Sequence, residues 1–138
     1  MIRGSNKRRR GALALAGLAL LAIPAGAAAP SGFAAFAKLQ PGKWQVRELD
    51  GATPPANICL GNPEQLLRFE HRTGAPCKME VLHNDPAGLT VQYSCPGRGF
   101  GHSALRVLTP RAVRIDSQGF SKGLPFSYKL DARRIGAC

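Results

Sequence analysis

The sequence predicts a mostly β (α+β) fold, in which an antiparallel β-meander, curled toward a half-barrel, carries one short helix packed on the sheet. The clearest strand is Gly88–Cys95, where Leu89, Val91, Tyr93 and Cys95 alternate with polar residues. Further alternating runs continue to the C-terminus, separated by segments rich in glycine and proline. Only one segment carries the residues that begin and end a helix, so we expect a single helix.

The first 27 residues have the organisation of a secretory signal peptide. Basic residues end at Arg10, an apolar run extends from Gly11 to Ile23, and small residues follow Pro24. A run of 13 residues is shorter than the roughly 20 that span a bilayer, and a retained membrane anchor stays open as the alternative. We expect cleavage after Ala27, which leaves 28–138 as a single exported domain, periplasmic or secreted, with no transmembrane span.

The charge of the exported part is only moderately basic. The leader takes five of the 19 basic residues and none of the 8 acidic ones, which leaves 14 against 8 and a net charge of +6. That excess is much less typical of a nucleic-acid-binding protein than the +11 of the whole chain.

Four cysteines remain after the leader: Cys59, Cys77, Cys95 and Cys138. An even number in an exported chain indicates disulfides, with three possible connectivities. Zinc is the alternative, but the sequence has no C-x-x-C pair. We predict Cys59–Cys77, which brackets the helix, and Cys95–Cys138, which ties the middle of the meander to its end.

The N-terminal part of the domain combines one strand, one loop and the helix. Phe33 and Phe36 share a face at helical spacing and indicate either a short helix or a frayed lead-in. Residues 43–47 form the first strand, with Trp44 and Val46 pointing inward. Residues 51–57, which contain two prolines, are predicted as a loop that shelters the sheet edge.

The helix is predicted from its caps. Asn62 is a good N-cap, Pro63 suits the first helical position, and Gly74 ends the helix. Leu66 and Leu67 supply the buried stripe. Five strands follow, at 78–83, 89–95, 103–108, 112–116 and 125–133, and residues 96–101 are predicted as a turn.

Several residues match the pattern of a known family. They are the opening strand Gly42-Lys43-Trp44, Cys59-Leu60 before a Pro-Glu helix start, the single Cys77, the strand that ends in Cys95, and the terminal Arg133-Arg134-Ile135-Gly136-Ala137-Cys138. Over essentially all of 28–138 the chain resembles the bacterial domain-of-unknown-function family numbered 3617, small exported proteins of Gram-negative bacteria. The helix entry Leu60–Glu64 is one residue longer than the family's pattern. The resemblance implies compartment and fold, and no catalytic residue, because the family has no established activity.

Few residues indicate chemistry. Ser103 lies in a near match to the G-x-S-x-G nucleophile elbow, but Leu105 occupies the second glycine position and a strand follows instead of a helix. Gly97, Gly99 and Gly101 resemble a phosphate loop, again without the helix that such a loop requires. Three isolated histidines, at positions 71, 83 and 102, lack metal-ligand spacing. We therefore assign no catalytic residue, cofactor or metal.

Basic residues recur at the outward positions of the predicted sheet. The predicted basic positions are Arg47, Arg106, Arg114, Lys129 and Arg133, with Lys43 beside them and Glu48, Asp116 and Asp131 as the acids. A solvated face that protects the sheet is the simpler interpretation. The functional interpretation is a surface for an anionic cell-envelope component, and nucleic acid is disfavoured because few aromatic residues lie between these positions.

The sequence therefore favours a non-enzymatic binding or envelope-associated module. The alternative is an enzyme, hydrolase-like, whose site residues converge only in the fold.

Overall fold

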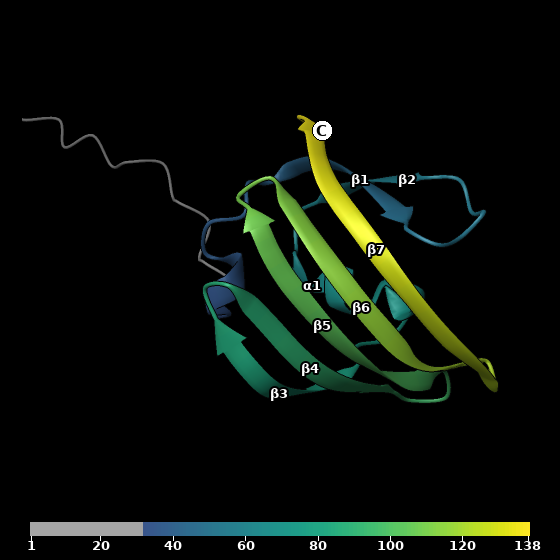
Figure 1. The fold of residues 1–138 in the computed structure, drawn as a ribbon. Coiled ribbons are helices and arrows are strands. Elements are labelled where there is room, and N and C mark those ends of the chain that lie inside the picture. The colour runs from purple at the N-terminus through teal and green to yellow at the C-terminus, as the bar shows by residue number, and fades with distance from the viewer. Residues whose placement is uncertain (1–31) are drawn as a thin grey trace, which may run out of the picture.

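The structure, a computed structural model, describes residues 32–138, and the predicted signal peptide at 1–27 lies outside them. The chain forms one antiparallel sheet in the order β2-β1-β7-β6-β5-β4-β3 (Figure 1). Its strands are β1 (Gly42–Glu48), β2 (Ala56–Leu60), β3 (Lys78–Asp85), β4 (Gly88–Cys95), β5 (Gly99–Thr109), β6 (Ala112–Ser121) and β7 (Leu124–Gly136). Between 32 and 138, no helix is long and apolar enough to cross a membrane.

The prediction of a mostly β, antiparallel fold is confirmed. The consecutive strands β3 to β7 form the predicted meander, and the sheet stays open, with β2 and β3 at its two edges. All five predicted C-terminal strands are present and most run further than expected. The prediction of a turn at 96–101 is wrong in its second half, because β5 already begins at Gly99.

The prediction of a loop before the helix is also partly wrong. Ala56–Leu60 forms β2, which pairs antiparallel with β1 from Gly42 opposite Leu60 to Val46 opposite Ala56. β2 therefore extends the sheet beyond β1 as an edge strand of five residues.

One face of the sheet carries the core. Three strands contribute fully buried side chains to this face: β1 with Trp44, β4 with Val91, and β6 with Val113 and Ile115. The short helix α1 (Glu64–Leu67) packs against them and lies behind the sheet in Figure 1. The opposite side of the sheet is called the outer face below.

The helix begins at Glu64, one residue later than predicted, with Pro63 as its N-cap, and it ends early. Asn62 Oδ1 accepts a hydrogen bond from the backbone N–H of Glu64 at 2.9 Å. The α-helix stops at Leu67, and a 3-10 turn, η2 (Phe69–His71), follows. The Leu67 carbonyl accepts from Ser103 Oγ, while the His71 N–H donates to the Arg68 carbonyl at 2.8 Å instead of continuing the α-helical pattern. A tertiary contact thus replaces the next α-helical bond.

The predicted disulfide connectivity is wrong. The structure pairs Cys59 with Cys138 and Cys77 with Cys95. Cys77 directly precedes β3, and because Lys78 lies opposite Ser94, Cys77 faces Cys95 across the β3–β4 pair. Cys59 lies on β2, at the other edge of the sheet, where Lys43 is opposite both Cys59 and Gly136. The C-terminal residue therefore reaches Cys59 across the end of β1.

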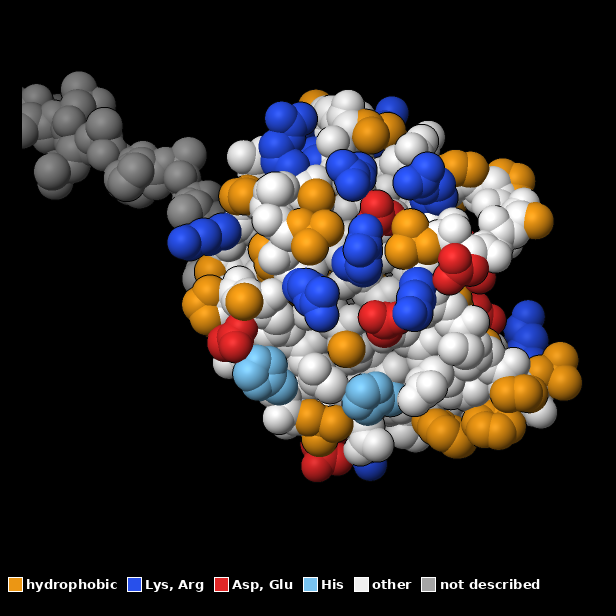
Figure 2. Space-filling view, viewed as in Figure 1, with side chains coloured by type: hydrophobic (Ala, Val, Ile, Leu, Met, Phe, Trp, Pro, Cys, Tyr) orange, Lys and Arg blue, Asp and Glu red, His pale blue; other side chains and the backbone are white. Residues whose placement is uncertain are grey.

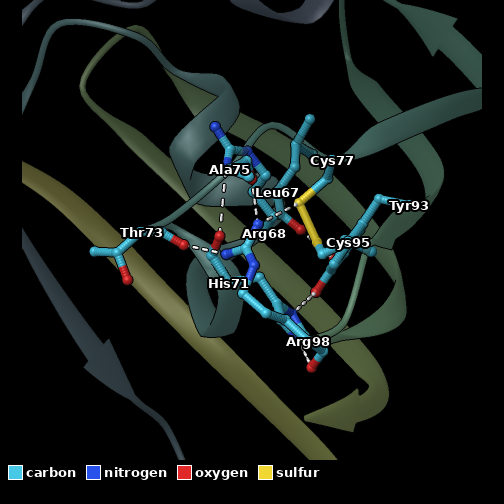
Figure 3. Close-up of a disulfide and its surroundings, with 10 residues drawn as sticks. Leu67, Arg68, His71, Thr73, Ala75, Cys77, Tyr93, Cys95 and Arg98 are labelled. Carbon is cyan, nitrogen blue, oxygen red and sulfur yellow. Dashed lines mark hydrogen bonds between the residues drawn. A yellow bond between two sulfur atoms is a disulfide. The ribbon is translucent and has the colours of Figure 1, made fainter. Parts of the chain in front are cut away.

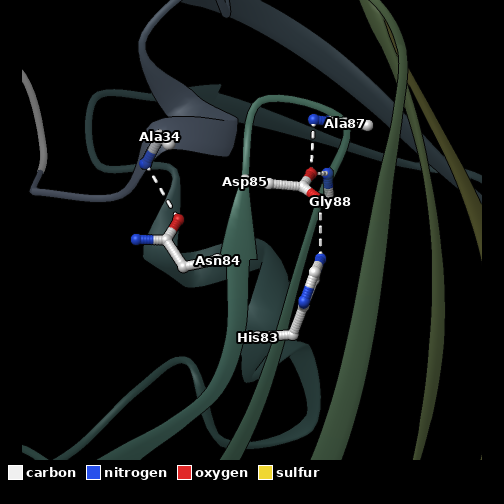
Figure 4. A network of polar contacts seen from close by, with 6 residues as sticks. All are labelled: Ala34, His83, Asn84, Asp85, Ala87 and Gly88. Carbon is white, nitrogen blue, oxygen red and sulfur yellow. Dashed lines mark hydrogen bonds and ion pairs between the residues drawn. The ribbon is translucent and has the colours of Figure 1, made fainter.

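The lead-in to β1 is a 3-10 turn, η1 (Ala34–Phe36), rather than a longer helix. Phe36 is buried in the core, and the Phe33 ring meets it edge to face at 5.7 Å between centroids. The turn is fixed to β3, since the Ala34 N–H donates to Asn84 Oδ1 at 2.9 Å (Figure 4).

Candidate functional site

The strand register brings the predicted basic residues together on the outer face. Arg106 on β5 lies opposite Arg114 on β6, Arg114 lies opposite Asp131 on β7, and Asp131 lies opposite Arg47 on β1. Directly opposed residues share a face, and neighbouring strands are about 4.8 Å apart, so this row spans about 14 Å. We call the following set the basic face: Arg47, Arg106, Arg114, Lys129 and Arg133.

The side chains of this face are visible together. Figure 2 shows Lys and Arg side chains over the middle and upper part of the surface formed by β5, β6 and β7, with few acidic side chains among them. Lys129 lies opposite Asp116, and Arg133 lies opposite Ala112 and Gln45. Glu48 was predicted on the outer face, but it lies opposite the core residue Leu130 and therefore points to the helix side of the sheet.

Asp131 is the buried centre of the basic face. Only 5% of its surface is exposed. Its Oδ1 accepts from Nε and Nη2 of Arg114, both at 3.1 Å, and its Oδ2 accepts from Arg133 Nη2 at 3.3 Å. The carboxylate therefore holds two guanidinium groups in fixed positions while their outer edges stay in solvent.

The charge of this surface remains positive after its internal pairs are counted. Five cations face two carboxylates, Asp116 and Asp131, which leaves a net charge of +3. Lys129 approaches Asp116 only to 3.9 Å, with both side chains exposed, so this pair is weak. Among the described residues, no carboxylate lies within ion-pair distance of Arg47 or Arg106.

Ser103 is a structural residue. It lies on β5 with none of its surface exposed, and its Oγ donates to the Leu67 carbonyl and lies 2.7 Å from Ser117 Oγ. No histidine is among its hydrogen-bond partners, and a buried hydroxyl has no access to substrate. Ser103 thus anchors the end of α1 to the sheet.

Replacing Ser103 by alanine should lower the free energy of unfolding by about 1–3 kcal/mol, because the buried Leu67 carbonyl loses its donor. Urea denaturation measures the change. Ser94→Ala on the neighbouring strand β4, at an exposed position, is the matched control and should change stability by less than about 0.5 kcal/mol. Equal effects of the two substitutions would contradict the anchoring role of Ser103.

The three histidines have separate roles. His71 is buried between the helix and the sheet, where its Nε2 lies 3.1 Å from the Arg98 carbonyl and its Nδ1 lies 3.3 Å from the Tyr93 hydroxyl (Figure 3). A carbonyl only accepts, so Nε2 carries the proton and Tyr93 donates to Nδ1. Burial, with Tyr128 nearby, raises the pKa of Tyr93 far above its ordinary value and keeps it a donor.

The Arg98 side chain completes this cluster. Its guanidinium donates to the carbonyls of Thr73 and Ala75 and lies 3.7 Å from Cys77 Sγ (Figure 3). It thereby fixes the loop after the helix to the turn after β4, beside the Cys77–Cys95 disulfide. These contacts stabilise the fold, and they occupy the Arg98 guanidinium N–H groups that would otherwise bind a substrate.

His83 belongs to the β3–β4 turn. Its Nε2 lies 2.7 Å from Asp85 Oδ2, and Asp85 Oδ1 accepts from the N–H groups of Ala87 and Gly88 at 2.7 and 2.8 Å (Figure 4). The Ala87 N–H, followed by His83 and the Gly88 N–H, holds the pKa of Asp85 below its ordinary value. His102 lies on β5, so the three imidazoles sit on different elements. From 32 to 138, no three histidine, cysteine or acidic side chains are placed to hold a metal.

The sequence identified the basic positions but missed the burial of Asp131. Alternation along the predicted strands assigns a side chain to one face, and the five basic residues do share that face. Which acid lies between which arginines depends on strand register across β6, β7 and β1, and no local pattern reports that register.

Comparison with protein-family models, curated proteins and solved structures finds no match to this chain.

Proposed function

We propose that this protein is an exported, non-enzymatic binding module that holds an anionic component of the bacterial cell envelope on its basic face. Export is supported by the signal-like leader at 1–27 and by two disulfides, which persist in oxidising compartments such as the periplasm. We include in this proposal the resemblance to the exported family numbered 3617, which implies the same compartment. The ligand chemistry is phosphate or carboxylate.

The row of Arg106, Arg114 and Arg47 around the buried Asp131 carries the proposal. Arginine presents several N–H donors in a planar fork that matches phosphate and carboxylate oxygens. The sheet and Asp131 fix the direction of Arg114 and so reduce the entropy lost on binding. Along this row Arg106 and Arg114 are about 5 Å apart and Arg114 and Arg47 about 10 Å apart, a spacing suited to a ligand with several anionic groups.

The enzyme alternative has weaker support. Ser103 is buried and bound to backbone, and the described histidines make structural contacts or stand apart from any nucleophile. The buried Tyr93 and the half-buried Tyr128 have raised pKa values, with burial as the main cause, and they face the helix side of the sheet. No observation favours a specific reaction.

Purified lipopolysaccharide should bind the protein, and binding should weaken steeply as salt rises beyond physiological strength, where the screening length is about 8 Å. The double variant Arg47→Gln, Arg106→Gln should bind about 30-fold more weakly, at about 1 kcal/mol for each charge. Asp131→Asn should lower the free energy of unfolding by about 1–3 kcal/mol, because the buried side chain loses the charge that pairs with Arg114 and Arg133. Biolayer interferometry across a salt series measures these affinities.

The matched control for charge is the double variant Lys38→Gln, Lys122→Gln, which removes the same net charge from two exposed positions off the basic face. It should bind nearly as well as the wild type. Equal losses in the two double variants would overturn the proposal, as would equal binding to dephosphorylated lipopolysaccharide. Tighter binding to a single-stranded oligonucleotide of equal charge would assign the face to nucleic acid instead.

A further inference from the structure

A groove of about 700 Å³ lies at the other end of the outer face, away from the arginine row. Two neighbouring rows of side chains form most of it. The first row runs Gln92, His102, Gln118 and Ser127 across β4, β5, β6 and β7, and the second runs Ser94, Phe100, Phe120 and Pro125 across the same strands. The two rows are two residues apart along each strand, or about 7 Å.

The second row presents exposed aromatic rings. Phe100 is 53% exposed and Phe120 is 44% exposed, and their ring centroids are 5.3 Å apart. Figure 2 shows hydrophobic side chains gathered at the lower right of this face, over the end of the β6–β7 hairpin. Paired aromatic rings in solvent are typical of a binding surface, because the same rings pack inside the core when they serve stability alone.

The first row presents neutral hydrogen-bonding groups. Gln92 and Gln118 each offer an amide donor and an amide acceptor, and His102 and Ser127 add further groups of both kinds. No formal charge lies within the two rows, since Lys78 and Glu80 stand at the margin, on the edge strand β3. The groove is therefore complementary in charge to a neutral ligand, in contrast to the basic face.

Exposed aromatic rings beside neutral hydrogen-bonding groups favour a sugar over an alkyl chain as the neutral ligand. An alkyl chain would cover Gln92, His102 and Gln118 without offering them any partner, and each polar group so buried costs about 1–3 kcal/mol. A sugar ring offers a face of C–H groups to Phe100 and Phe120 and a rim of hydroxyls to the amides. A volume of about 700 Å³ is also within the range of ligand sites.

We propose that this groove binds neutral saccharide units of a glycan chain, with Phe100 and Phe120 as the ring platform and Gln92, His102 and Gln118 as the hydroxyl partners. The inference does not depend on the anion-binding proposal, because the ligand is uncharged and the residues are different. The two sites lie on one face, so a charged polysaccharide could contact both.

A panel of neutral hexasaccharides tests the inference: β-1,4-linked glucose, α-1,4-linked glucose, β-1,4-linked N-acetylglucosamine and β-1,4-linked mannose. Isothermal titration of the wild type should show a Kd below about 1 mM for at least one member. The variant Phe120→Ala should weaken that binding about tenfold, and Gln118→Ala about fivefold, as expected for one ring contact and one hydrogen bond. Both positions are exposed, so the variants should keep the wild-type melting temperature.

Two controls separate this site from its neighbours. Leu124 is 70% exposed near the same hairpin but does not line the groove, so Leu124→Ala should bind the hexasaccharide as the wild type does. The double variant Arg47→Gln, Arg106→Gln should also leave it unchanged. Absence of binding to the whole panel, or equal binding by wild type and Phe120→Ala, would overturn the inference. So would binding of decanol without any glycan, or dimerisation through the groove in analytical ultracentrifugation.

Discussion

Replacing both Cys59 and Cys138 by serine should lower the free energy of unfolding by about 4 kcal/mol. The bond closes a loop with a sequence separation of 79 residues, and loop closure in the unfolded chain becomes more unfavourable with length. It also holds the edge strand β2 to the C-terminus across β1. The corresponding double variant at Cys77 and Cys95, with a separation of 18, should lose about 3 kcal/mol.

Thiol titration of the unfolded Cys59→Ser, Cys138→Ser variant tests the connectivity at the same time. The structure leaves the Cys77–Cys95 bond intact in this variant, so no free thiol should react. Two reactive thiols would mean that Cys77 and Cys95 are not partners, as in the pairing that the sequence predicted, and would contradict the structure. Urea denaturation of both double variants gives the two free energies.

Replacing Trp44 by alanine should lower the free energy of unfolding by about 3–5 kcal/mol. The side chain is fully buried on β1, between β2 and β7, and its Nε1 donates to the Gln40 carbonyl at 3.0 Å. The substitution removes a large apolar contact and leaves a cavity in the core. Because small domains are stable by about 5–15 kcal/mol, the variant should be partly unfolded at 37 °C.

Trp44→Phe separates packing from the hydrogen bond. It keeps most of the apolar contact and loses the Nε1 donor, so it should cost about 1–2 kcal/mol. Chemical denaturation monitored by circular dichroism measures both variants, since the only tryptophan is removed and fluorescence loses its probe. A loss below about 1 kcal/mol for Trp44→Ala would contradict a central place for this residue in the core.

The meander was predictable because alternation is a local property of the chain. In β4, Leu89, Val91, Tyr93 and Cys95 are buried as the sequence indicated, and the buried residues of β5 follow the same period. In β6 and β7 the period is interrupted where Ala112 and Asp131 are buried on the outer face. β2 was missed because it has five residues, follows two prolines and pairs with a single neighbour. Its sheet partner, rather than its own composition, makes it a strand.

The error in β2 led to the error in the disulfides. The predicted loop ended at residue 57, and with no strand assigned to Cys59, Cys77 was its simplest partner because the two cysteines bracket the helix. Once Cys59 lies on β2, it stands at the opposite edge of the sheet from Cys77, which precedes β3. Disulfide connectivity depends on sheet order, and sheet order is set by contacts between residues far apart in the sequence.

In the helix, neighbouring residues determine where it begins, whereas a residue far away in the sequence determines where it ends. Its start was predicted to within one residue, and Asn62 does accept from the Glu64 N–H, because capping depends on neighbouring residues. Its early end at Leu67 follows from the hydrogen bond that Ser103 Oγ donates across 36 positions of sequence. In the same way, the sequence placed the five cations on one face but gave no indication that Asp131 is buried among them.

On our proposal, the outer face of the sheet binds anionic groups through the arginine row. The most direct measurement is an NMR titration of the ¹⁵N-labelled protein with a water-soluble bisphosphorylated glucosamine disaccharide. Saturable shifts are expected at the side-chain Nε–H groups of Arg47, Arg106, Arg114 and Arg133 and at the surrounding backbone of β5 to β7. Added salt should reverse these shifts. Shifts centred instead on α1 or on the β2 edge, or no saturable shift at the arginine row, would contradict it.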